Sequence, residues 1–128
     1  MIVGIGTDLV EIARIERVYG RHGTRLLARV LGEIERSHCP SPDSPRFSAW
    51  VAKRFAAKEA AVKALGTGFR DGICLPDVQT VHDSLGAPSL HFSGGALQRL
   101  HDLGASRFQL SVTDERHYAL AFVVIERD

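Results

Sequence analysis

An aspartate near the start of the chain is the first residue whose surroundings suggest chemistry. Asp8 stands in the stretch GIGTDLVEI, where an apolar run precedes it and further apolar residues follow it. A carboxylate in low-dielectric surroundings costs several kcal/mol unless it is paired or coordinates a metal. The position of Asp8 therefore calls for a cation close to its side chain.

A second unusual position lies in the helical pattern predicted for residues 46–65. In a helix that advances about 100° per residue, the large apolar side chains of this segment share one face, which should pack on the core. Lys58 lies within that apolar stripe, and Glu59 and Arg54 lie on its two borders. In a purely structural helix, Lys58 would extend along the edge of the core and Glu59 would pair with Lys63 four residues later. Three charged residues at one apolar stripe favour a functional role for this helix instead.

Two carboxylates of this kind, one after a strand and one on a helix, suit a Mg²⁺ site that handles phosphate. Mg²⁺ prefers oxygen ligands and is commonly held by one or two carboxylates together with substrate phosphates. The glycines match neither the G-x-x-x-x-G-K-[ST] phosphate loop nor the dinucleotide-binding spacing. The residues by themselves therefore indicate Mg²⁺-dependent phosphate chemistry of an unspecified kind.

The elements that hold these residues follow from periodicity and from glycine and proline positions. We expect a strand at residues 1–7, a helix from about Leu9 with Asp8 as its N-cap, a second helical stretch at 24–38 and a loop at 39–45. After the helix at 46–65 come a hairpin of strands 78–82 and 88–92, a short helix at 94–104 and strands near 108–113 and 118–125. The last strand is almost continuously apolar, which predicts that both its faces are covered. This mixture without a strict βαβ alternation predicts the α+β class.

Length and composition favour a single domain spanning residues 1–128. The chain is 45% hydrophobic and 24% charged, as in ordinary globular proteins. No apolar run is long enough to span a membrane, and the first residues have no secretory signal pattern. Cys39 and Cys74 are too few for a disulfide framework, which favours a reducing cytoplasm.

The charges are distributed unevenly although the net charge is only +1. Residues 14–29 and residues 46–70 are both rich in arginine and lysine, which predicts an anionic ligand or partner. A non-catalytic basic module that binds an acidic protein or nucleic acid is the alternative. Nucleic-acid binding would require a stronger positive charge and more aromatic residues among the arginines, so we expect neither a nucleic-acid nor a membrane partner.

Two long motifs resemble those of the holo-acyl-carrier-protein synthase family, the short class of 4′-phosphopantetheinyl transferase. They are GIGTDLVEIARIE near the start and RFAAKEAAVKALGTG at residues 54–68, and the tail TDERHYALAFVVIE is similar to the closing strands of the family. The resemblance implies a small antiparallel sheet packed against a long helix and shorter helices. It also implies transfer of the phosphopantetheine arm of coenzyme A to a serine of acyl carrier protein, with Mg²⁺, in cytoplasmic fatty-acid synthesis. The family is typically a homotrimer with active sites between subunits.

The resemblance also assigns roles to individual residues. Asp8 and Glu59 match the two metal ligands and catalytic acids of the family. The matches to the coenzyme A site are Arg54, Lys58, Lys63, Gly66, Thr67 and Gly68, with Arg54 and Lys63 expected at its phosphates and the glycine loop at its nucleotide end. The predicted contacts to the acidic carrier protein are Arg14, Arg21 and Arg25.

Two departures from the family pattern affect this assignment. Asp114 stands where some members have a histidine that contacts coenzyme A, and Gly32 replaces the polar residue that usually precedes the acid at position 35. The base that takes the proton of the carrier serine stays open between Glu59 itself, a metal-bound water held by Glu59, and Glu35.

Overall fold

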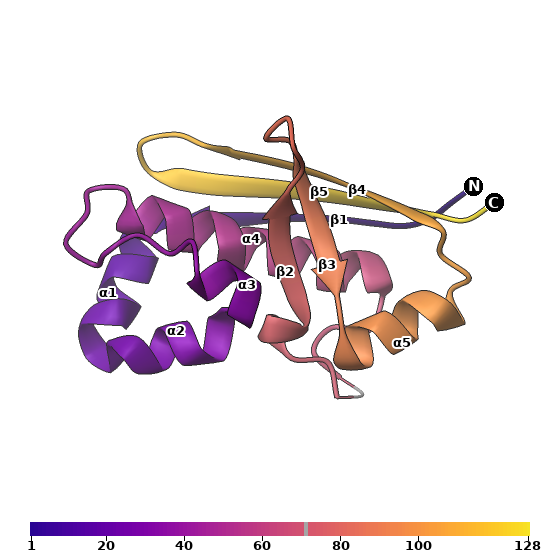
Figure 1. Cartoon of the computed structure of the whole chain (residues 1–128), viewed down its shortest axis with the longest axis horizontal. Helices are drawn as coiled ribbons and strands as arrows, with labels where there is room; N and C mark the ends of the chain where they lie inside the picture. Colours follow the sequence, from indigo (N-terminus) through magenta and orange to yellow (C-terminus); the bar gives the residue numbers. More distant parts are fainter. Residues whose placement is uncertain (71) are drawn as a thin grey trace.

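The computed structural model describes residues 1–70 and 72–128, which form a three-stranded sheet, a two-stranded hairpin and five α-helices. In chain order the elements are β1 (Ile2–Glu11), α1 (Ile12–His22), α2 (Thr24–Val30), α3 (Glu33–Arg36), α4 (Phe47–Leu65), the 3₁₀ turn η1 (Leu75–Asp77), β2 (Val78–His82), β3 (Pro88–Phe92), α5 (Gly94–Asp102), β4 (Arg107–Asp114) and β5 (Tyr118–Glu126). Figure 1 shows α4 beneath the sheet, with the hairpin and the shorter helices around it. This arrangement confirms the predicted small antiparallel sheet on a long helix.

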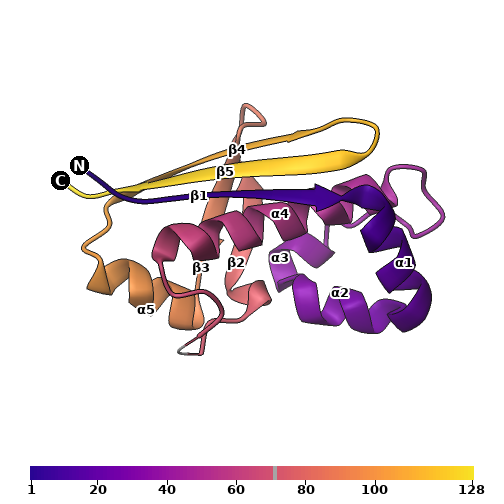
Figure 2. The ribbon, with the colours of Figure 1, turned by 180° about the vertical axis from the view of Figure 1, so that it is seen from behind.

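The main sheet has the order β1-β5-β4, and both pairings are antiparallel. The two chain termini meet at one end of the strands β1 and β5, where the Met1 amino group donates to the Arg127 carbonyl (Figures 1 and 2). Because side chains alternate along a strand, Asp8 points to the same face of β1 as Gly4, Gly6 and Val10, the face that packs on α4.

Two glycines allow β1 and α4 to approach unusually closely. A Cβ atom added to Gly4 would lie 2.0 Å from the Ala64 carbonyl oxygen, and one added to Gly6 would lie 2.0 Å from the Ala60 carbonyl oxygen. No side chain fits at either position without moving the helix. The backbones of the strand that carries Asp8 and the helix that carries residue 59 are therefore in direct contact.

The helix α4 is buried on most of its surface rather than along one stripe. Only Ala49 of its seven alanines is partly exposed, and the other six are almost fully inaccessible: Ala52, Ala56, Ala57, Ala60, Ala61 and Ala64. The sheet covers one side of α4, and α1, β2 and α5 contact other parts of it (Figure 2). The buried part of the helix surface is therefore wider than the single apolar face that we predicted, because the alanines also pack against neighbouring elements.

The strand β1 continues four residues beyond its predicted end. It pairs with β5 as far as Glu11, opposite Tyr118, and α1 begins only at Ile12. Asp8 is thus a strand residue paired with Ala121, and the prediction that it caps a helix was wrong. The predicted helix at 24–38 is also interrupted, since the chain is extended at Leu31 and Gly32 between α2 and α3.

The predicted hairpin has the bounds expected from its turn residues. Val78 pairs with Phe92 and His82 pairs with Pro88, and Asp83 holds the turn by accepting hydrogen bonds from the backbone of Leu85 and Ala87. None of the helices in the described part of the chain is long and apolar enough to cross a membrane.

The outer face of the three-stranded sheet is apolar and exposed in the single chain. Its large side chains retain between 38% and 61% of their accessible surface: Ile5, Leu9, Tyr118, Leu120 and Phe122. The inner face of β5 is buried at every second residue. The prediction that both faces of β5 are covered therefore fails within one chain.

Candidate active site

The aspartate of β1 and the last turn of α4 form the centre of the candidate site. The Lys63 ammonium donates to Asp8 Oδ1 at 3.2 Å and to the carbonyl of Thr7 at 2.9 Å. The Asp8 side chain retains 17% of its accessible surface, whereas that of Lys63 retains 55%. Asp8 thus has the predicted cationic partner, and Lys63 pairs with Asp8 rather than with Glu59.

The Glu59 carboxyl lies near this pair, one turn before Lys63 on α4. Burial raises the pKa of Glu59, the negative charge of Asp8 raises it further, and Lys63 and Arg14 act in the opposite direction. Glu59 forms no ion pair within 4.0 Å among residues 1–70 and 72–128. Two carboxylates therefore share a half-buried region where their charges repel each other.

This arrangement fits a Mg²⁺ ion that is completed by a ligand. Asp8 and Glu59 supply the hard oxygen donors that Mg²⁺ prefers, and a cation between them would relieve their repulsion. Within the described ranges no group of three or more His, Cys, Asp or Glu side chains gathers at a potential metal site. Two carboxylates alone leave most of an octahedral shell open, as expected for an ion that also binds substrate phosphates.

The basic residues expected at the carrier surface lie on two helices. Arg14 and Arg21 are exposed on α1, seven residues apart and so on nearly the same side of that helix. The chain turns at Gly23, where φ is +56°, and Arg25 lies on α2. Arg25 therefore belongs to a different helix from Arg14 and Arg21, although all three residues are exposed.

Lys58 and Glu35 form an ion pair in the core, and both side chains are fully inaccessible. The Lys58 ammonium donates to the Glu35 carboxylate and to the backbone carbonyls of Leu75 and Val78. Glu35 also accepts hydrogen bonds from the backbone N–H groups of Gly32 at 3.1 Å and Thr80 at 3.0 Å. Both side chains lie away from Asp8 and Glu59 in the core, so the structure does not bring Lys58 to the other predicted coenzyme A residues, and the burial of Glu35 argues against it as the base.

The first turn of α3 is capped by a residue that the sequence did not reveal. Gln79 of β2 accepts hydrogen bonds through Oε1 from the backbone N–H groups of Ile34 at 2.9 Å and Glu35 at 3.3 Å. A Cβ atom on Gly32 would lie 2.1 Å from the Gln79 side chain. Gly32 therefore leaves room for the side chain of Gln79, which accepts the hydrogen bonds that a polar N-cap side chain would otherwise accept.

Arg54 lies on a different side of α4 from Glu59 and Lys63. Its guanidinium stacks 4.3 Å from the Trp50 ring centre, and its buried Nε has no hydrogen-bond partner in the described part of the structure. It borders a pocket of about 440 Å³ with Thr80, whose buried hydroxyl is likewise unpartnered. Arg54 and Lys63 are nine residues apart, about half a turn around the helix axis, so one chain does not bring them to the same ligand.

The glycine loop after α4 begins in a left-handed conformation. Gly66 has φ +80° and Gly68 has φ +64°, and the Thr67 hydroxyl donates to the Gly68 carbonyl within the loop. Arg99 of α5 donates through Nε to the carbonyl of Leu65 at 2.9 Å. The loop is thus near Lys63 in the chain, and its start contacts a side chain that sequence reasoning did not single out.

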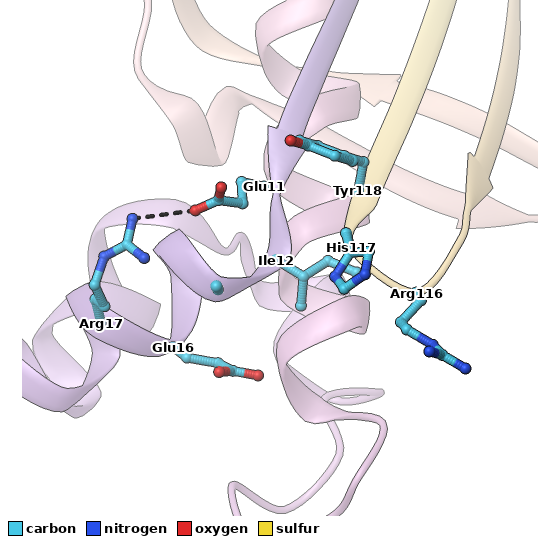
Figure 3. A pocket seen from close by; sticks show the side chains of 8 residues that line it. Glu11, Ile12, Glu16, Arg17, Arg116, His117 and Tyr118 are labelled. Atoms are coloured by element: carbon cyan, nitrogen blue, oxygen red, sulfur yellow. Dashed lines mark hydrogen bonds and ion pairs between the residues drawn. The ribbon is translucent and has the colours of Figure 1, made fainter.

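A separate pocket of about 600 Å³ lies where α1 begins, beside the turn between β4 and β5 (Figure 3). Figure 3 shows the Glu11–Arg17 ion pair, 3.2 Å long, on one side and Arg116 and His117 on the other. Neither Asp8 nor Glu59 lines this pocket. A smaller pocket of about 530 Å³ includes Glu59 together with apolar residues of the loop before η1.

Comparison with known proteins gives consistent results. The sequence profile of the 4′-phosphopantetheinyl transferase superfamily matches residues 4–123. The holo-[acyl-carrier-protein] synthase of Alkalilimnicola ehrlichii is 55% identical over 127 residues, which cover 98% of each chain. The crystal structure of the holo-[acyl-carrier-protein] synthase from Neisseria meningitidis matches with a TM-score of 0.90 at 39% identity, covering 99% of this chain and 100% of that one. The enzyme of that name from Bacillus anthracis, solved in complex with CoA (3′,5′-ADP), matches with a TM-score of 0.82 at 34% identity, covering 100% and 99%.

Proposed function

Because this chain belongs to the 4′-phosphopantetheinyl transferase superfamily, we propose that it is an enzyme that transfers the 4′-phosphopantetheine arm of coenzyme A to a serine of apo acyl carrier protein. The products are holo acyl carrier protein and adenosine 3′,5′-bisphosphate. Such an activity serves fatty-acid biosynthesis, and we infer a cytoplasmic location. The free thiols of Cys39 and Cys74 agree with that location.

The observation that carries the proposal is the meeting of Asp8 and Glu59 beside Lys63 and Arg14. Two carboxylates from distant parts of the chain are held in a half-buried region although their charges repel each other. A fold that needed neither charge would gain stability by replacing one of them. We take this cost as a sign that the region serves ligand binding.

Asp8 and Glu59 are the residues that would hold Mg²⁺. When bound, Mg²⁺ supplies positive charge that neutralises the pyrophosphate of coenzyme A while its bridging P–O bond breaks. Lys63 is the exposed member of its ion pair with Asp8, and its ammonium would be free to donate to a phosphate oxygen if Mg²⁺ took over the charge of Asp8.

The reaction joins the serine oxygen to the phosphorus that bears the pantetheine arm and breaks the bond from that phosphorus to the leaving nucleotide. The serine hydroxyl must lose its proton in this step. Glu59 is the candidate for taking this proton, and because a carboxylate that holds a metal is a weak direct base, we favour transfer through a water held by Glu59. Glu35 is excluded from this role by its burial against Lys58.

The exposed arginines of α1 and α2 suit an acidic protein partner. Arg14 is close enough to influence Glu59, while Arg21 is exposed farther along α1 and Arg25 is exposed on α2. A carrier protein that docks on these residues would present its serine next to the carboxylates. Electrostatic attraction of this kind chiefly accelerates association.

A homotrimer with active sites between subunits is supported by two features. The exposed apolar outer face of the sheet, defined by Ile5, Leu9, Tyr118, Leu120 and Phe122, is a surface that association would cover. Arg54 and Lys63 face opposite sides of α4, so a second copy is needed for both to contact one coenzyme A. Light scattering at micromolar concentration tests the assembly, and a monomer would contradict it.

The activity is tested by incubating the protein with apo acyl carrier protein, coenzyme A and Mg²⁺ and measuring the mass of the carrier. We expect a phosphopantetheine adduct that chelation of Mg²⁺ abolishes and that Glu59→Gln strongly reduces. Glu16→Gln is the matched control, because Glu16 is an exposed acid of α1 that lines the separate pocket. Absence of the adduct with the wild-type protein would reject the proposal.

A further inference from the structure

Arg99 joins α5 to the C-terminal end of α4. Its Nε donates to the carbonyl of Leu65, the last residue of the helix, at 2.9 Å. The final carbonyls of an α-helix have no partner within the helix and carry its negative dipole end. The cationic guanidinium of Arg99 therefore satisfies one of these carbonyls and suits their charge.

The same side chain lies beside the start of the glycine loop. A Cβ atom on Gly66 would be 3.8 Å from Nη2 of Arg99, so the guanidinium extends along the loop backbone. Gly66 and Gly68 both occupy left-handed conformations, which glycine adopts easily and also leaves easily. The Thr67 hydroxyl donates to the Gly68 carbonyl within the loop, whereas Arg99 contacts the start of the loop from outside, through the Leu65 carbonyl.

Arg99 is half-buried and keeps donors for further contacts. A guanidinium has five N–H donors, and only the one on Nε has a partner in the part of the chain that the structure describes. No carboxylate lies within 4.0 Å of it among these residues. The loop is therefore flanked by an uncompensated positive charge on α5 in addition to Lys63 on α4.

We propose that Arg99 is a positioning residue for the nucleotide end of coenzyme A, because it fixes residues 66–68 in the conformation that binds this part of the substrate. The inference rests on the proposed function and on the resemblance of residues 66–68 to the family motif, which assigns this loop to the nucleotide. A loop with two left-handed glycines loses much conformational freedom on binding, and a loop already anchored at one end loses less. Affinity for the nucleotide thus depends on a side chain that lies outside both motifs.

The direct test measures binding of adenosine 3′,5′-bisphosphate to the full-length protein by calorimetry in the presence of Mg²⁺. We expect Arg99→Leu to bind about tenfold more weakly, the loss of roughly one charge-assisted hydrogen bond. Arg99→Lys should recover most of the affinity, since an ammonium also donates to the Leu65 carbonyl. Leu103→Ala is the matched control, because Leu103 directly follows α5, packs on the core and makes no hydrogen bond through its side chain.

Steady-state transfer assays give the second measurement. The KM for coenzyme A should rise in Arg99→Leu while kcat and the KM for the carrier protein stay within about twofold of wild type. Wild-type affinity in Arg99→Leu, or an equal loss in Leu103→Ala, would overturn the inference and leave the proposed function intact. A wild-type protein that binds the nucleotide but transfers nothing would instead reject the proposed function.

Discussion

The ion pair between Lys58 and Glu35 provides the most demanding test of the structure. Lys58→Met removes the charged ammonium and keeps an unbranched side chain only one atom shorter, so the buried Glu35 carboxylate loses its main partner. We expect a large loss of stability, because removing one partner of a buried ion pair leaves the other charge uncompensated.

The size of the loss follows from the contacts that remain. Breaking a buried pair generally costs about 3–5 kcal/mol. In Lys58→Met the Glu35 carboxylate still accepts from the backbone N–H groups of Gly32 and Thr80, and Arg54 lies 3.8 Å away. These contacts place the expected loss near the lower end, about 3 kcal/mol, which for a chain of this length corresponds to roughly 10–15 °C in melting temperature.

Thermal melts at one fixed protein concentration measure this loss, because the stability of an assembly depends on concentration. The double variant Lys58→Met/Glu35→Gln should recover part of it, since the amide removes the unpaired charge and still accepts a hydrogen bond. A Lys58→Met protein that melts within about 3 °C of wild type would refute the account of this pair as a buried, mutually dependent contact.

The same variants separate a structural role from a catalytic one. Glu35→Gln, assayed well below its melting temperature, should keep most of the wild-type kcat, because Glu35 is fully buried away from the carboxylate pair. A fully folded Glu35→Gln protein without transfer activity would show that Glu35 takes part in the reaction after all.

Three further predictions concern the site and its support. Burial and the charge of Asp8 raise the pKa of Glu59 above the ordinary carboxyl value of 4.5. Between these two pKa values the folded wild type binds more protons than the unfolded chain, so the folded state loses stability as the pH rises through this range. Without metal, Glu59→Gln should therefore melt above wild type at pH 7 and lose this advantage as pH falls to 4.5; a constant difference in melts across this range would contradict the reasoning. Arg14→Glu should weaken carrier binding about tenfold and reduce its salt dependence with coenzyme A affinity retained, as titration of each ligand will show. Gly32→Ser should lower stability by about 2 kcal/mol in denaturant unfolding because its Cβ meets Gln79, and Gln79→Ala should restore part of this loss by making room for serine to cap α3; additive losses would argue against that exchange.

Much of the fold could be predicted from local signals. The hairpin and α4 were located almost to the residue, because glycines and prolines bound them on both sides. The extension of β1 could not be predicted, because Asp8 is a favourable helix N-cap and only pairing with β5, more than a hundred residues later, keeps the segment extended as far as Glu11.

The sequence predicted the residues of the candidate site that lie in the two family motifs, but it did not predict the contacts that support them. Asp8 and Glu59 were expected together, and their electrostatic coupling agrees with that expectation. The pairing of Lys58 with Glu35 is invisible in the sequence, because the two residues lie 23 positions apart on different elements and a lysine in an apolar stripe suggests a ligand as readily as a partner. The cap that Gln79 provides is hidden for the same reason.

The backbone contact at Gly4 and Gly6 has a consequence for how this protein tolerates change. Main-chain atoms of Ala60 and Ala64 occupy the space where side chains of residues 4 and 6 would lie. The distance between β1 and α4 is therefore set by backbone contact and does not depend on the size of a side chain between them. Substitutions on the arginine-rich helices α1 and α2 can therefore change partner choice while the span between the two acids stays constant. Redesign for a new carrier should leave these two glycines and the outer sheet face unchanged and vary the exposed residues of α1 and α2.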